Sequence, residues 1–138
     1  MTTFTDSTAR DAVMAWKHRQ VVRYATALLV AGFRVLRRDG ATYFGTDDVG
    51  EADQPAGDDA ASIPGSAVVM LRRGGCIADY YGTHPDAGVS HGRRRSKRES
   101  RNGAKVGLYV LIVPMAREWL LRNGVRVAEE QRELALAV

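Results

Sequence analysis

The chain has 138 residues, of which 45% are hydrophobic and 26% are charged, and its formal net charge is +4. This length and composition predict a single globular domain over residues 1–138, with enough apolar material for one core. The lone cysteine, Cys76, excludes an internal disulfide framework and favours a reducing compartment. Seventeen of the 20 basic residues are arginine, a bias typical of G+C-rich coding in bacteria and phages.

The sequence also bears on where the protein acts. Residues 1–6 lack the basic-then-apolar layout of a signal peptide. The longest apolar run, residues 106–113, is too short to cross a bilayer. We therefore expect a cytoplasmic protein, or one within a virion if it comes from a phage, with no membrane partner.

The first predicted element is a long helix from about residue 8 to residue 30. Ser7 and Thr8 supply oxygens that suit an N-cap. From Met14 onward, apolar residues recur at three-, four- and seven-residue spacing, so they share one face of the helix. Gly32 follows as a natural C-cap.

Two β-hairpins are predicted after this helix. The first covers residues 33–44 and turns at Asp39 and Gly40, because a type I′ turn needs the positive φ that glycine adopts readily. The second covers residues 67–81 and turns at Gly74 and its glycine neighbour. Together they predict four strands.

A strand and one or two helices complete the predicted fold. Residues 105–113 are apolar at almost every position, which predicts a central strand covered on both faces. Pro114 suits the start of a helix that runs to residue 122, and a further helix is predicted around residues 128–136. The predicted class is α+β, with a long N-terminal helix, a mainly antiparallel sheet of about five strands and C-terminal helices.

Two long loops of opposite charge separate these elements. The acidic loop, residues 46–66, has a net charge of −6, and the basic loop, residues 82–104, leads into the central strand. The acidic residues of the first loop are Asp47, Asp48, Glu51, Asp53, Asp58 and Asp59. The basic residues of the second loop and its end are Arg93, Arg94, Arg95, Lys97, Arg98, Arg101 and Lys105.

The basic loop carries the main functional hypothesis. From Arg93 to Lys105 the net charge is +6, so the segment should repel itself and stay open to water. A polyanion would relieve this repulsion and release counterions. We therefore expect a non-enzymatic protein that contacts the nucleic-acid backbone with little sequence preference, since no aromatic residues lie within the run.

An alternative hypothesis uses both loops. In a ring or other multimeric assembly, such as a phage particle, the acidic loop of one copy would meet the basic loop of the next copy. Within a single copy, the acidic loop would instead fold over the basic loop and compete with phosphate. Exposed ion pairs contribute only about 0–1 kcal/mol each, so such pairing alone would not hold an assembly together.

Nothing in the sequence indicates catalysis or a bound cofactor. Cys76, His84 and His91 are spaced unlike the paired ligands of zinc sites. The phosphate-binding spacing G-x4-GK[ST] and the dinucleotide fingerprint are both absent. We expect no catalytic residues, no metal site, no cofactor and no small-molecule substrate.

Overall fold

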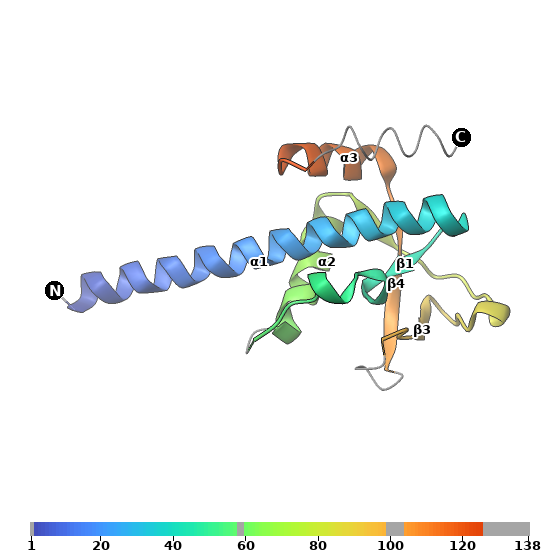
Figure 1. Cartoon of the computed structure of the whole chain (residues 1–138), viewed down its shortest axis with the longest axis horizontal. Coiled ribbons are helices and arrows are strands. Elements are labelled where there is room, and N and C mark those ends of the chain that lie inside the picture. Colours follow the sequence, from blue (N-terminus) through green and yellow to red (C-terminus); the bar gives the residue numbers. More distant parts are fainter. Residues whose placement is uncertain (1, 58–59, 99–103, 126–138) are drawn as a thin grey trace.

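The computed structural model describes residues 2–57, 60–98 and 104–125, with side chains described from residue 9 onward (Figure 1). This part of the chain is α+β, as predicted, with three α-helices and an antiparallel sheet of four strands instead of about five. The helices are α1 (Thr2–Asp39), α2 (Ile63–Arg73) and α3 (Val113–Arg122). The strands are β1 (Phe44–Gly45), β2 (Ile77–Asp79), β3 (Arg93–Arg95) and β4 (Lys105–Leu111).

The first predicted hairpin is wrong, because α1 continues through its first half to Asp39. Gly40 has a φ of +60°, so its left-handed backbone follows the end of a helix and does not turn a hairpin. Gly32 is not a C-cap either. A Cβ atom at Gly32 would lie 3.0 Å from the Phe44 ring, so glycine there allows β1 to pack closely against α1.

The second predicted hairpin is also wrong in its first half, which belongs to α2. Ala67, Val68 and Leu71 are buried at helical spacing, and this face packs on α1 and the sheet. Gly75, with a φ of +74°, follows the end of α2 just as Gly40 follows the end of α1. A short apolar run that would suit a strand is therefore one buried face of a helix.

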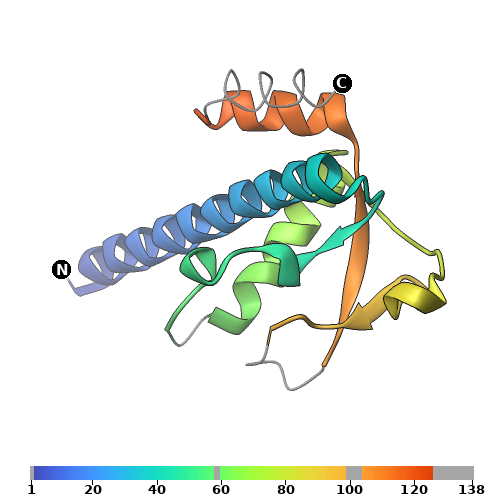
Figure 2. The same cartoon turned by 45° about the vertical axis from the view of Figure 1, so that its right-hand side comes forward.

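The prediction that β4 is the central strand is confirmed. The strand order is β1-β4-β2, and β3 pairs with another part of β4, all antiparallel (Figure 2). Tyr109 and Leu111 pack against the core that α1, α2 and α3 form, whereas Val106 and Leu108 are buried outside that cluster. Alternate residues of β4 thus serve the two faces of the sheet.

The predicted helix after Pro114 is confirmed as α3, with the proline in its first turn. Trp119 and Leu120 are buried, whereas Leu121 is 66% exposed. Gly124 follows the helix with a φ of +73°. The predicted helix at 128–136 lies outside the described residues.

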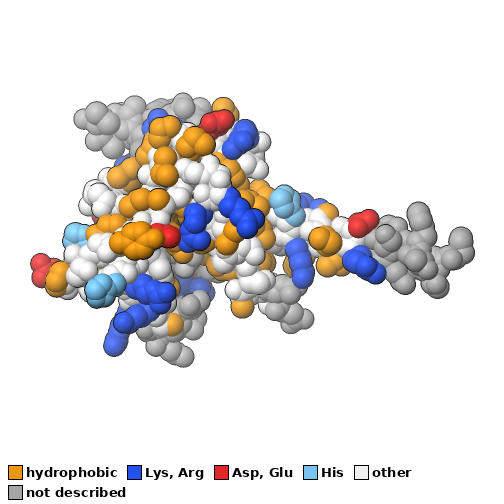
Figure 3. Space-filling model, turned by 180° about the vertical axis from the view of Figure 1, so that it is seen from behind, with side chains coloured by type: hydrophobic (Ala, Val, Ile, Leu, Met, Phe, Trp, Pro, Cys, Tyr) orange, Lys and Arg blue, Asp and Glu red, His pale blue; other side chains and the backbone are white. Residues whose placement is uncertain are grey.

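The first part of α1 extends beyond the body of the domain (Figures 1 and 3). Every side chain from residue 9 to residue 19 is exposed, including Val13, Met14 and Trp16. Among the described residues, no helix combines the length and apolar character needed to cross a bilayer.

Candidate nucleic-acid interface

The described residues of the segment predicted as an acidic loop, 46–57 and 60–66, contain several short helices and a few buried side chains. Three short 3₁₀ helices occupy Thr46–Asp48, Glu51–Asp53 and Ala60–Ser62, and α2 begins at residue 63. Val49 is buried in the core between the first two of these helices. The first of these helices therefore places Asp47 and Asp48 beside the ribbon that β3 and β4 form.

Arg94 binds two of these carboxylates. Its Nε lies 3.0 Å from Asp47 Oδ2 and its Nη2 lies 2.7 Å from Asp47 Oδ1, a bidentate pair. The same Nη2 lies 2.7 Å from Asp48 Oδ2. The side chains of Asp47 and Asp48 are 0% and 5% exposed and that of Arg94 is 9% exposed, so this is a buried ion-pair cluster.

The protonation states in this cluster follow from its contacts. Burial alone would raise the pKa of the Asp48 carboxyl, but the Gly45 amide, Lys97 and Arg94 together lower it below its usual value. Burial likewise works against the charge on Arg94, yet Asp47 and Asp48 raise its pKa further. Asp48 and Arg94 are therefore both charged near neutral pH.

Two further basic side chains bind the same acidic segment. Lys97 Nζ lies 2.9 Å from Asp48 Oδ1, and Arg98 Nε lies 2.9 Å from Glu51 Oε1. The expectation that the basic run stays open to water is therefore wrong for Arg94, which is buried with its carboxylates. Lys97 stays exposed although it pairs with Asp48, and Arg98 is half-buried beside Glu51. Of the other acidic residues, Asp53 is exposed and belongs to the second 3₁₀ helix.

These contacts place the two loops together within one copy of the chain. Asp47, Asp48 and Glu51, which the assembly hypothesis assigned to a neighbouring subunit, already have partners on the basic segment. Three other residues of the predicted sites, Asp58, Asp59 and Arg101, lie outside the described residues.

The alternation of β3 sends its other two arginines to the opposite face. Arg93 pairs with Gly107 and Arg95 pairs with Lys105 across the ribbon, so their side chains share the face of β4 that carries Tyr109. Arg93, Arg95 and Lys105 are all exposed. Within the described part of the chain, none of the three forms an ion pair with a carboxylate.

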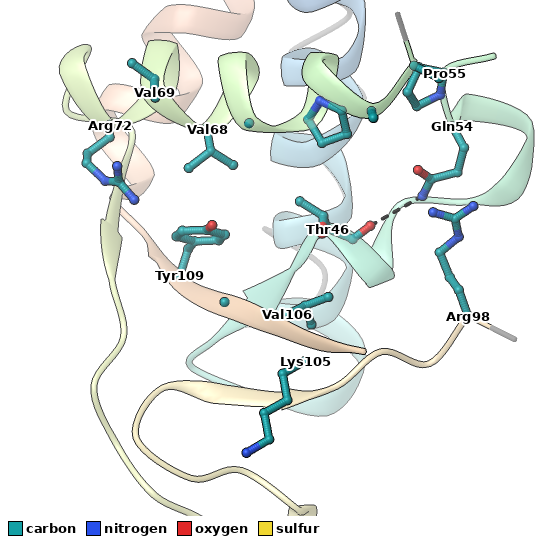
Figure 4. A pocket seen from close by; sticks show the side chains of 15 residues that line it. Thr46, Gln54, Pro55, Val68, Val69, Arg72, Arg98, Lys105, Val106 and Tyr109 are labelled. Carbon is teal, nitrogen blue, oxygen red and sulfur yellow. Dashed lines mark hydrogen bonds between the residues drawn. The ribbon is translucent and has the colours of Figure 1, made fainter. Parts of the chain in front are cut away.

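This face of the ribbon borders a cleft against α2 (Figure 4). The cleft has a volume of about 620 Å³, and Arg72 of α2 and Arg98 lie at its two ends. None of the described residues that line it is acidic. We call the exposed basic residues along this side of the molecule the cation face, defined as Arg72, Arg93, Arg95 and Lys105.

Arg72 is the member of the cation face that the sequence did not indicate. It was assigned to a hairpin strand, whereas α2 carries it to the edge of the cleft, where its Nη2 lies 2.8 Å from Asp79 Oδ1. Burial raises the pKa of the Tyr109 hydroxyl, while nearby Arg72 and Arg93 act in the opposite direction. A helical pattern over residues 63–73 was the signal that would have found it.

No protein-family model, curated protein or solved structure matches the chain. In the part of the chain that the structure describes, no three His, Cys, Asp or Glu side chains are grouped to hold a metal ion.

Proposed function

We propose that this protein contacts the nucleic-acid backbone through the cation face and acts without catalysis. The observation that carries the proposal is the separation of charge across the β3–β4 ribbon. Carboxylates occupy one side, and the other side presents Arg93, Arg95 and Lys105 to solvent. Exposed arginine and lysine side chains with few acidic neighbours suit phosphate contacts.

The shape of this side supports a duplex as the ligand. The helix α2 and the ribbon lie on either side of one cleft, and both border it with basic side chains. The major groove of B-DNA accepts an α-helix or a two-stranded ribbon, and phosphates flank that groove. Apart from Arg72, the α2 residues that line the cleft carry no polar side chain (Pro64, Gly65, Val68 and Val69), so we expect weak sequence preference.

The space-filling view agrees with a basic surface. On the face seen in Figure 3, Lys and Arg side chains predominate over acidic ones and lie among hydrophobic side chains. Such mixed surfaces are typical of nucleic-acid interfaces, where the charged groups meet phosphates and the apolar groups meet sugars and bases.

The proposal is tested by the salt dependence of binding. Engagement of three or four phosphates predicts a slope of about −3 to −4 for log affinity of a 20-base-pair duplex against log salt. Replacing Arg93, Arg95 and Lys105 by alanine removes most of these contacts and should leave a slope of about −1. Fluorescence anisotropy at four salt concentrations measures both slopes.

A matched control changes the net charge by the same amount elsewhere. Arg10, Arg19 and Arg23 are exposed on α1, so their replacement by alanine should leave the slope near that of the unaltered protein. Equal slopes for the cation-face variant and the unaltered protein would remove the proposal.

The alternative function is that of a subunit in a larger assembly. The pairing of acidic and basic loops between subunits no longer supports it, because Asp47 and Glu51 have partners within the chain. The observation that supports it is the exposure of Val13, Met14 and Trp16 on α1. Apolar side chains gathered on an extended helix are typical of protein contacts. Sedimentation velocity at low and high protein concentration separates a monomer from an assembly.

A further inference from the structure

Tyr81 is the most exposed large hydrophobic side chain in the described part of the chain. Its exposed fraction is 79%, although it lies only two residues after β2 and its neighbour Tyr80 is packed in a stack with Tyr43 and His84. The two adjacent tyrosines point to opposite faces of the sheet. Tyr81 therefore lies on the side of the cation face.

The surroundings of Tyr81 are basic. A hollow of about 240 Å³ is lined by Tyr81 together with Arg72, His91 and Arg93. Among the described residues that line it, Asp79 is the only acidic one, and its Oδ1 accepts a hydrogen bond from Arg72. The hydroxyl of Tyr81 donates to the other oxygen of Asp79 in a long, exposed contact of 3.4 Å.

The backbone around the hollow is tightly held. His91 has a φ of +54°, a left-handed conformation that is uncommon outside glycine and that persists where the surrounding structure enforces it. The next residue, Gly92, donates to the Gly82 carbonyl at 2.9 Å, and a Cβ there would lie 1.8 Å from the Tyr80 carbonyl oxygen. The segment that carries Tyr81 is thus fixed against the segment that carries Arg93.

We propose that Tyr81 is a stacking surface for an unpaired nucleobase, with Arg93 and Arg72 on the phosphates of the same strand. An aromatic ring can stack on a base only where no neighbouring base covers it. The inference rests on the proposed function and narrows its ligand to a duplex with a single-stranded extension. The ring supplies a contact that the phosphate-binding residues lack, and it tolerates any base.

The test uses a duplex with a five-nucleotide extension that contains 2-aminopurine, and the same duplex with blunt ends. The full chain is compared with Tyr81→Ala and Tyr81→Phe. Loss of the ring should weaken binding to the extended duplex about 5- to 100-fold and abolish quenching of 2-aminopurine. Binding to the blunt duplex should change less than about twofold, because the phosphate contacts remain.

Tyr81→Phe separates stacking from the hydroxyl contact to Asp79 and should bind like the unaltered protein. Circular dichroism of each variant checks the fold. Wild-type affinity of Tyr81→Ala for the extended duplex would overturn the inference while leaving the proposed function intact. An equal loss on both duplexes would overturn it too. Failure of the unaltered protein to bind either duplex would remove the proposed function and this inference together.

Discussion

The two faces of the β3–β4 ribbon use the same residue type for opposite purposes. Three consecutive arginines form β3, and the middle one is buried while its neighbours are exposed. Arg94 is fixed by Asp47 and Asp48, whereas Arg93 and Arg95 lie on the opposite face and are exposed to solvent. A count of charges along a chain therefore does not define a binding surface, because strand alternation decides which charges remain accessible.

The buried face of the ribbon, which carries Arg94, also positions the exposed face. The bidentate contact from Arg94 to Asp47 ties the ribbon to the first 3₁₀ helix, and the Lys97 amide donates to the same carboxylate at 3.2 Å. With β3 fixed in this way, Arg93 and Arg95 are displayed in one orientation. Asp47 and Asp48 thus hold β3 in place, and do not only compete with a phosphate ligand for its arginines.

The largest expected effect comes from removing the buried arginine. Arg94→Met leaves Asp47 and Asp48 buried without their main counter-charge, which should lower the free energy of unfolding by about 3–5 kcal/mol. Urea denaturation measures this loss. The matched variant Arg93→Ala, one residue away on the exposed face, should change stability by less than about 0.5 kcal/mol. Similar losses for both variants would contradict the distinction between the faces.

A smaller effect is expected when the pH is lowered. The pKa of Asp48 is lower in the folded protein than in the unfolded chain, where it is about 3.9. Its charge therefore stabilises the fold above that pH, and this contribution is lost as the pH falls through the folded value. Asp48→Asn should be less stable by about 1–3 kcal/mol at pH 7.

The gap between the unaltered protein and Asp48→Asn should then narrow as the pH falls below about 4. Urea midpoints at pH 7, 5 and 3 measure it. A gap that stays constant over this range would show that the Asp48 charge does not stabilise the fold.

The smallest effect concerns the partly exposed pair at the edge of the cleft. Glu51→Gln removes the carboxylate that pairs with Arg98, which borders the cleft, and so makes Arg98 available to phosphate. Binding to duplex DNA should tighten by only about two- to fivefold, because the exposed ion pair that is lost is weak. Asp53→Asn removes the same charge from an exposed position on the same 3₁₀ helix. Equal gains from both variants would mean that only net charge matters, and that Arg98 does not act locally.

The sequence predicted the α+β class, the central β4 strand and α3, because each rests on a strong local pattern. It failed at residues 33–38 and 67–72, where the short segments fit a strand or a helix equally well. Tertiary packing decided both: the face of α1 that carries Gly32 receives the Phe44 ring, and α2 packs along α1. Gly40 and Gly75 do lie where the chain reverses, as predicted. Each of them follows a helix, however, and not a strand of a hairpin.

The candidate site was predictable only as a region. The sequence located the run from Arg93 to Lys105, but it could not show which of its charges would meet carboxylates some 47 residues earlier in the chain. Pairing across such separations depends on how β3 registers on β4. Arg72 was missed because its place on the cation face depends on α2 being a helix.

The long α1 helix has a consequence for how the domain is oriented. At 1.5 Å per residue, the helix from Thr2 to Asp39 is about 57 Å long, and its first half stands clear of the core. The second half is fixed by Ala25, Leu28 and Leu29. A molecule that binds the first half of α1 would therefore set the orientation of the ribbon from a distance, without contacting it.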